Sequence, residues 1–277
     1  MSYSAYKWKS KVTGHSERAD LSSKAVKSSI PVLAALIGVL NAPASAQQLS
    51  QPPQQGQTPA IERADDKKSK ITFAVYFLSN DRNYDINLRH QFGHVVAWLA
   101  GFYDPKGDSQ ARIGAEYDFQ HKWLLFIPTL EVGSNGALAG SLYAELGSKN
   151  YGIVGYSQTN LKPFNDLFFD PSESLQLGAG RKINQYDKIY GYTIFDVRLH
   201  THQQDTHVLW RHKLNSANGI TVDGLYKSGH GDDGAYVRAV GIGVYYDRPS
   251  WFWKAYYDPH VNFSSQTMVR AGVGLKF

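Results

Sequence analysis

The last stretch of the chain, residues 267–277 (TMVRAGVGLKF), decides the fold class. Apolar side chains stand at every second position, and polar or glycine residues stand between them. The apolar set is Val269, Ala271, Val273, Leu275 and Phe277. Successive side chains of a β-strand point to opposite faces, so this alternation predicts a strand with one apolar and one polar face.

The same alternation recurs upstream, from about residue 70 onward. Segments 111–119, 188–199 and 220–227 each separate an apolar face from a charged face. Short turns are predicted between such segments at 120–122, 148–150, 184–187, 215–219 and 247–250. A second set of predicted connections alternates with these turns along the chain, and several of its members are longer. They lie at 104–108, 134–137, 160–173, 201–205, 230–235 and 258–266. Short turns at one end and longer loops at the other are typical of transmembrane β-barrels.

The number of strands is less well defined than their existence. Counting back from Phe277 gives about twelve strands that begin near Val95. Residues 71–79 and 84–92 add two more, which makes fourteen, and an even number is expected either way. Within 84–102, however, the apolar residues also fit the spacing of a helix, so strand and helix both stay open for this region.

The composition limits the possible classes of protein. The chain has 13% aromatic residues, 19% charged residues and no cysteine. Without cysteine there is no disulfide framework, no thiol nucleophile and no cysteine-ligated metal, and we expect no cofactor. A polar chain with many aromatic residues and glycines fits either a soluble all-β protein or a transmembrane β-barrel.

The N-terminal region predicts export from the cytoplasm. Lys24 and Lys27 precede an apolar run at 30–40 (IPVLAALIGVL), and a small-residue site, Ala44-Ser45-Ala46, follows it. This pattern is typical of a secretory signal peptide. We therefore expect a signal peptide at 1–46 cleaved after Ala46, a disordered Gln- and Pro-rich linker at 47–69, and a barrel domain at 70–277.

The basic character of the chain belongs mostly to this leader. The formal net charge is +5, but residues 1–46 contain six of the 29 Lys and Arg and two of the 24 Asp and Glu. The remainder therefore has a net charge of +1. Binding to nucleic acid depends on a surplus of basic residues, so we expect no nucleic-acid partner.

With the leader, the alternating strands, the aromatic residues beside the short turns and a terminal strand that ends in Phe277, residues 70–277 resemble the Gram-negative outer-membrane β-barrel superfamily. The resemblance implies an all-β antiparallel transmembrane barrel in the bacterial outer membrane, in contact with outer-membrane lipids and lipopolysaccharide. It also implies that the barrel assembly machinery recognises the last strand through Phe277. The alternative is a soluble β-sandwich, in which the apolar faces turn inward.

The polar faces of the predicted strands carry charges of both signs. The candidates for lumen or selectivity residues are Arg112, Glu116, Asp118, Asp196, Arg198, Arg211, Lys227, Arg238 and Arg270. They indicate either a charged constriction in a water-filled channel for small polar or anionic solutes, or interior ion pairs that hold a small barrel shut.

A histidine-rich segment at 200–207 (HTHQQDTH) lies at a predicted strand end and in an exposed loop. We expect no metal site; the residues that could ligate a metal are His200, His202 and His207, since the first two share one face of an extended strand. As an alternative, His200, His202 and Asp205 are candidates for a catalytic site like those of the outer-membrane phospholipase and lipid A deacylase barrels. Those families place a serine two residues after the catalytic histidine, where this chain has His202. The third interpretation is that these histidines are solvated residues of a loop without a specific role.

The segment 160–171 (NLKPFNDLFFDP) is the longest predicted loop and is unusually apolar. It is expected either to fold into the lumen or bind a surface ligand, or to pack on the rim as an ordered loop. The favoured function is a passive channel, or porin. The alternatives are a lipid-modifying hydrolase with a site at the rim and a non-conducting structural or adhesion barrel.

Overall fold

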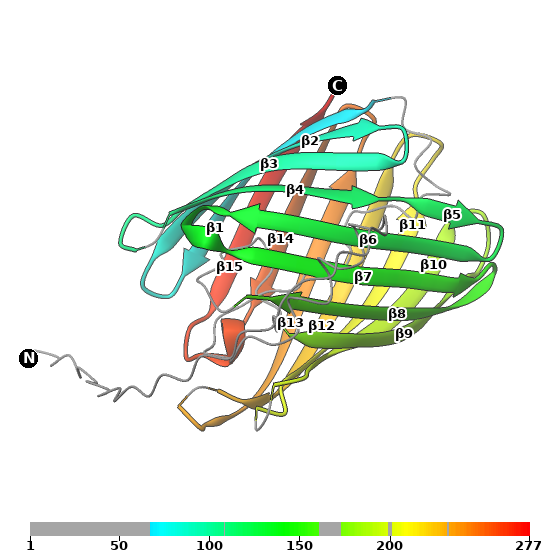
Figure 1. Cartoon of the computed structure of the whole chain (residues 1–277). Coiled ribbons are helices and arrows are strands. Elements are labelled where there is room, and N and C mark those ends of the chain that lie inside the picture. Colours follow the sequence, from blue (N-terminus) through cyan, green and yellow to red (C-terminus); the bar gives the residue numbers. More distant parts are fainter. Residues whose placement is uncertain (1–66, 108, 161–172, 199–200, 232) are drawn as a thin grey trace, which may run out of the picture. The chain divides into compact units, whose positions relative to one another are not determined.

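The computed structural model describes residues 67–277, except 108, 161–172, 199–200 and 232 (Figure 1). The predicted signal peptide and nearly all of the predicted linker lie outside the described residues. In the part that is described, two short 3-10 turns, Ser134–Gly136 and Val261–Phe263, are the sole helical elements. No helix there is long and apolar enough to cross a membrane.

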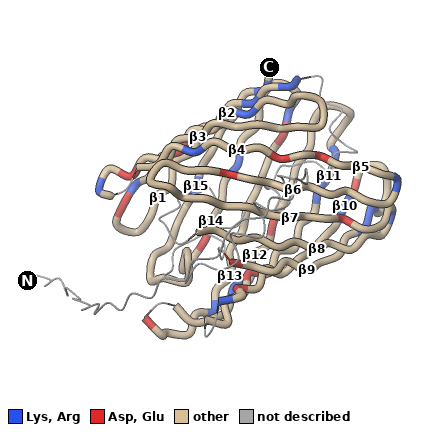
Figure 2. Tube along the Cα trace, viewed as in Figure 1, with Lys and Arg blue, Asp and Glu red and all other residues tan. Residues whose placement is uncertain are grey.

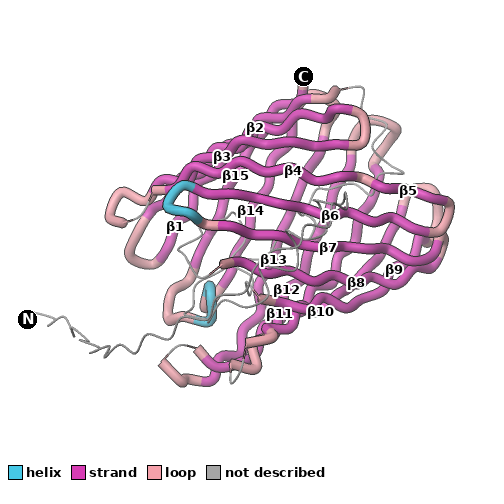
Figure 3. The backbone as a smooth tube through the Cα atoms, viewed as in Figure 1, coloured by secondary structure: helices cyan, strands magenta, loops and turns pink. Residues whose placement is uncertain are grey.

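The described chain folds into β-strands that follow one another in sequence around a single sheet (Figures 1 and 3). The strands are β1 (Ser69–Leu78), β2 (Arg82–Phe92), β3 (Val95–Tyr103), β4 (Gln110–Tyr117), β5 (Phe119–His121), β6 (Leu124–Gly133), β7 (Leu138–Gly147), β8 (Asn150–Thr159), β9 (Ser174–Lys182), β10 (Asp187–Asp196), β11 (Gln204–Lys213), β12 (Gly219–His230), β13 (Tyr236–Asp247), β14 (Trp251–Asp258) and β15 (Met268–Lys276).

The sheet closes on itself. β1 pairs antiparallel with both β2 and β15, and β4 pairs with both β3 and β6. β4 and β5 are two parts of one strand, because both pair with β6 in one continuous register: Glu116 opposes Thr129 and Phe119 opposes Phe126. The ladder of backbone hydrogen bonds is interrupted between β4 and β5. Pro128 of β6 lies opposite this interruption, and proline has no N–H to donate. The fold is therefore an antiparallel barrel of fourteen strands.

The expectation of about twelve strands is therefore wrong, and the alternative of fourteen is confirmed. The two additional strands are β1 and β2, and β2 lies in the region whose spacing also fitted a helix. There, Leu88 and Leu99 oppose each other on the outside of β2 and β3, 43% and 58% exposed. Their apparent helical spacing arises because apolar residues from two separate strands, joined by a short turn, are read as one periodic run.

The connections divide into two sets at opposite ends of the barrel (Figure 3). One end, called here the short-turn end, holds 93–94, 122–123, 148–149, 183–186, 214–218 and 248–250. The start of β1 and the end of β15 also lie there, joined by two backbone hydrogen bonds of 2.9 and 3.0 Å between Ser69 and Phe277. At the other end, the long-loop end, lie the described residues of the connections that follow β1, β3, β6, β8, β10, β12 and β14. This separation agrees with the predicted turn pattern.

The two faces of the barrel differ as the alternation predicted. On β15, Val273 and Leu275 are 58% and 57% exposed, whereas Arg270 is 3% exposed. Large apolar side chains are exposed on the outside of most strands, up to 69% for Val240. A soluble sandwich would bury these side chains between its sheets. An apolar exterior on a closed barrel is the arrangement of a membrane-spanning β-barrel.

Exposed aromatic residues gather near the short-turn end of this exterior, as expected for rings at a membrane interface. They include Tyr117, Phe119, Trp123, Trp251 and Trp253. Tyr151 and Phe252, which also stand beside short turns, instead point into the barrel and are 5% and 3% exposed.

Inward-pointing rings pack over glycines of adjacent strands. A Cβ atom at Gly114 would lie 2.3 Å from the indole of Trp98, and one at Gly180 would lie 2.2 Å from the ring of Tyr151. Glycine at these positions lets the ring lie flat against the wall. These glycines therefore serve the close approach of a side chain to the backbone.

Candidate functional site in the barrel interior

The inward face of the barrel carries most of the charged residues that the sequence assigned to it. Figure 2 marks where Lys, Arg, Asp and Glu stand along the strands. Five of them are at most 4% exposed, namely Arg112, Glu116, Asp118, Lys227 and Arg270. Three more are partly exposed and follow the inward positions of β10 and β11, namely Asp196, Arg198 and Arg211. The structure thus brings these eight residues to one surface.

Arg238 is the exception, and its assignment to the lumen face is wrong. It is exposed and shares the outward positions of β13 with Val240 and Ile242, while Val237 points inward and is 6% exposed. Its guanidinium lies 5.3 Å from the ring centre of Tyr236. Both residues stand at the start of β13, next to the long-loop end, where a charge on the outside lies near the edge of the apolar surface.

A first charge cluster lies on β2, β4 and β6. The Arg112 guanidinium is 2.7 Å from Asp85 Oδ2 and 3.7 Å from Glu131 Oε1. The indole N–H of Trp98 donates to Glu131. Arg89 lies 4.0 Å from Glu116 Oε1 and 4.5 Å above the Trp98 ring. Asp85 and Arg89 were missed in the sequence because they lie in the segment whose spacing also fitted a helix.

A second charge cluster lies on β11, β12, β14 and β15. The Asp223 carboxylate accepts a hydrogen bond of 3.2 Å from the Tyr256 hydroxyl and lies 3.0 Å from His207 Nδ1. The His207 ring stacks on Tyr192 with centroids 5.0 Å apart, and Arg270 lies 4.5 Å above Tyr256. The carboxylate is thereby held in place by partners from two other strands.

Two further ion pairs stand nearer the long-loop end. Lys227 Nζ is 2.7 Å from Asp258 Oδ1. Arg198 donates from Nε to Asp196 Oδ1 at 3.0 Å and from Nη2 to Asp196 Oδ2 at 2.7 Å, and the Thr201 hydroxyl donates to Oδ2 at 2.7 Å. The bidentate contact fixes the direction of the guanidinium.

The histidine-rich segment is divided by the start of β11 at Gln204. Asp205 and His207 lie on the inward face of this strand and are 0% and 4% exposed, so the prediction of an exposed loop is wrong for both. His202 does lie in the loop, exposed, with a left-handed φ of 50°. His200 and residues 161–172 of the predicted long loop lie outside the described residues. Over the part of the chain that is described, no three His, Asp or Glu side chains are placed to hold a metal ion.

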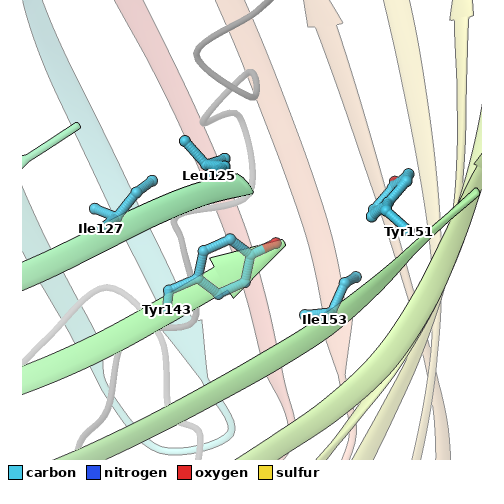
Figure 4. Close-up of a cluster of buried hydrophobic side chains, with 5 residues drawn as sticks. All are labelled: Leu125, Ile127, Tyr143, Tyr151 and Ile153. Atoms are coloured by element: carbon cyan, nitrogen blue, oxygen red, sulfur yellow. The ribbon is translucent and has the colours of Figure 1, made fainter. Parts of the chain in front are cut away.

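An apolar wall lines the interior on β6 to β11. Figure 4 shows its first part, in which side chains of β6, β7 and β8 point to the same side, and it comprises Leu125, Ile127, Tyr143, Tyr151 and Ile153. Its second part comprises Tyr192, Ile194 and Leu209, and Tyr190 packs against both parts. Sequence reasoning missed this wall. The available signal was that Tyr190 and Tyr192 share the positions of the inward Lys188.

The fold resembles those of solved outer-membrane barrels. The outer membrane protein Omp33 of Acinetobacter baumannii superposes with a TM-score of 0.50 over 76% of this chain and 98% of that chain, at 8% identity. The KdgM porin in complex with disordered oligogalacturonate gives a TM-score of 0.43 at 12% identity, over 75% and 99% of the two chains. A mutant of the Rh. blastica porin gives 0.44 at 10% identity, over 76% and 99%.

No protein-family model and no curated protein sequence matches the chain. The structural likeness therefore concerns the fold. A closed antiparallel barrel with an apolar exterior and a charged interior is consistent with a place in the bacterial outer membrane. The chain has the fold of the outer-membrane β-barrel superfamily.

Proposed function

We propose that this protein is a passive channel for small polar or anionic solutes. The observation that supports this most directly is the direction of its interior ion pairs. Asp85–Arg112 and Arg89–Glu116 join β2 to β4, and Lys227–Asp258 joins β12 to β14. Arg112–Glu131 and His207–Asp223 join adjacent strands.

Each of these pairs therefore runs along the wall, between strands at most two apart, and none of them bridges opposite sides. Ion pairs that held the barrel shut would have to span its diameter. The diameter of a barrel grows with its strand number, and side chains just fill an eight-stranded one. Fourteen strands with charges paired along the wall favour a polar passage over an interior closed by ion pairs.

The basic residues on the inner wall are accompanied by acidic residues. We therefore expect the channel to prefer anions only modestly and not to exclude cations. Arg198 is paired with Asp196, and Arg211 and Arg270 share the inward face with Asp223. Rings of charged side chains are one of the ways in which channels select ions. The transported solutes are accordingly proposed as small polar or anionic molecules.

Swelling of proteoliposomes tests this function. Vesicles that contain the refolded protein should swell in isosmotic arabinose and more slowly in larger sugars, because a channel discriminates by size. Vesicles without protein provide the baseline. Equal swelling with and without folded protein would contradict the proposal.

We also propose that the terminal strand carries the assembly signal. Phe277 is 63% exposed and is hydrogen-bonded to Ser69 at the seam where β15 meets β1. We expect the barrel assembly machinery to recognise this strand. We also expect the exposed aromatic residues to contact outer-membrane lipids and lipopolysaccharide.

A further inference from the structure

The connection between β14 and β15 turns back into the barrel. It comprises residues 259–267 at the long-loop end, and its centre is the 3-10 turn Val261–Phe263, drawn in cyan in Figure 3. The two apolar side chains of this turn are buried, since Val261 and Phe263 are each 2% exposed. A connection that extended into water above the strands would leave such side chains exposed.

Val261 is held by inward side chains near the seam where the barrel closes. It belongs to one cluster with Ala74 and Tyr76 of β1 and Met268 of β15. Tyr76 in turn makes an edge-to-face contact with Phe102 of β3, with ring centres 6.2 Å apart. Because Ala74 and Tyr76 stand four and two residues before the end of β1, this cluster lies inside the barrel, below the ends of the strands.

Phe263 is held by another part of the wall. Its ring centre lies 5.5 Å from Nζ of Lys227 on β12, and that ammonium also lies 2.7 Å from Asp258 Oδ1 at the end of β14. A Cβ atom at Gly231, directly after β12, would clash with the Phe263 carbonyl oxygen. The two apolar anchors of the connection thus reach β1 and β12, which are separated by β13, β14 and β15. The connection therefore crosses the inner side of these three strands.

The backbone of the connection is held in an unfavourable conformation. His260, Asn262 and Phe263 have φ values of 51°, 54° and 55°. A left-handed backbone is uncommon outside glycine and is especially unfavourable for a bulky residue such as phenylalanine. Such conformations persist where the surrounding contacts determine them, and they cluster at functional sites. A hydrogen bond of 2.9 Å from the Val261 N–H to the Gln266 carbonyl oxygen closes the turn, so the connection is a fixed element.

We propose that the β14–β15 connection is the constriction that sets the size limit for solutes at the long-loop end. Val261 and Phe263 are its positioning residues, because they anchor it to the wall. Residues 262–266 (NFSSQ) carry no charged side chain, so the connection sorts solutes by size and leaves the choice between anions and cations to the wall. This inference rests on the proposed channel function and names the element that limits it.

Replacement of residues 260–266 by Gly-Ser-Gly removes both anchors and shortens the connection. In planar bilayers the refolded variant should show a higher single-channel conductance than the wild type, at an unchanged ratio of anion to cation permeability. Proteoliposomes with the variant should swell in raffinose at a rate closer to that in arabinose. The control is the same replacement of residues 104–107, which are mostly exposed at the same end and should leave both readouts unchanged.

Two glycine variants separate the anchoring side chain from the strained backbone. Glycine adopts a left-handed φ at no steric cost, so both variants relieve the backbone equally. Phe263→Gly also removes an anchor and should raise the conductance and the raffinose rate. Asn262→Gly retains both anchors and should keep the size limit of the wild type. A rise of the same extent in both variants would contradict a positioning role for Phe263.

The position of the connection is measured independently of transport. The chain has no cysteine, so a substitution to cysteine introduces its single thiol. In the folded protein, Val261→Cys should be protected from a water-soluble maleimide, whereas Ser265→Cys, at an exposed position, should react. Addition of Phe263→Gly should remove the protection of the thiol at position 261. Mass spectrometry counts the labels.

The outcomes distinguish this inference from the proposed function. Rapid labelling of folded Val261→Cys would overturn the inward position of the connection. Protection of that thiol, together with equal conductance and size limit in the wild type and the replacement variant, would overturn the constriction and leave the channel function intact. Conductance that appears only after the replacement would support the connection as the limiting element and overturn the open channel proposed for the wild type.

Discussion

Asp85 and Arg112 lie on strands that flank β3, yet their side chains meet above it at 2.7 Å with at most 1% of either exposed. In the register of the sheet, Arg112 opposes Ala100 of β3, whose small side chain leaves room for this contact. Two strands that share no backbone hydrogen bond are thus connected through a charge pair on the inner surface.

Removal of one partner should destabilise the barrel strongly. Arg112→Gln leaves the Asp85 carboxylate buried without this guanidinium, and the expected loss is about 3–5 kcal/mol. Urea-induced unfolding in lipid vesicles, followed by tryptophan fluorescence, measures it. The double variant with Asp85→Asn should lose less than the sum of the two single variants.

A matched control is available at the surface. Lys106 lies 3.4 Å from Asp81, but its side chain is 64% exposed. Lys106→Gln should therefore cost no more than about 1 kcal/mol. An equal loss from Lys106→Gln and Arg112→Gln would show that burial of the inner pair has no energetic consequence.

A charge on the outside of the barrel should be far more harmful than one on the inside. On β7, Leu142 points outward and is 39% exposed, and Ser141, its neighbour, points inward and is partly exposed. Leu142→Arg should cost about 2–4 kcal/mol near the membrane centre, whereas Ser141→Arg should cost little. Heat-modifiable migration of outer-membrane fractions compares them. Poorer folding of Ser141→Arg than of Leu142→Arg would reverse the assignment of the two faces.

The glycine beneath Trp98 should resist even a small substitution. A Cβ atom at Gly114 would lie 2.3 Å from the indole and 2.9 Å from the Leu130 carbonyl oxygen. Gly114→Ala should therefore cost about 1–3 kcal/mol through overpacking. At Gly152 the nearest atom is 4.0 Å away, so Gly152→Ala serves as the control in the same unfolding assay. Comparable stability of the two variants would contradict the packing described here.

The terminal aromatic residue should affect assembly more than stability. Phe277 is exposed, and its backbone makes the hydrogen bonds to Ser69. Phe277→Ala keeps these bonds and should reduce the amount of barrel in the outer membrane while purified protein refolds normally in detergent. The exposed Phe92, also at the short-turn end, gives a control in Phe92→Ala. Equal outer-membrane levels of the two variants would contradict a signal at Phe277.

The alternation of side chains was sufficient to predict the β-barrel and the inward position of residues such as Arg112, Lys227 and Arg270. It was not sufficient where a residue type suits both faces. Tyr151 has an amphipathic ring that fits a membrane interface, but the strand pairing places Gly180 beside it, and the ring packs inward over that glycine. This neighbour belongs to another strand and cannot be identified from local sequence.

The residue at which a strand begins is equally hard to predict from the local sequence. Asp205 and His207 follow a loop-like histidine segment, but β11 already begins at Gln204, and both residues point inward. Arg238 stands close to a strand end, where a charge is tolerated on the outside. The apolar wall was missed because its members come from several strands, each of which contributes one or two residues.

The central claim, a polar passage through the barrel, is tested most directly by single-channel recording. The refolded protein, with folding verified by heat-modifiable migration, is added to a planar lipid bilayer in potassium chloride. The account predicts discrete current steps whose size rises with salt concentration, and a reversal potential slightly toward that of chloride under a salt gradient. An absence of steps from protein that is demonstrably folded and inserted would contradict it.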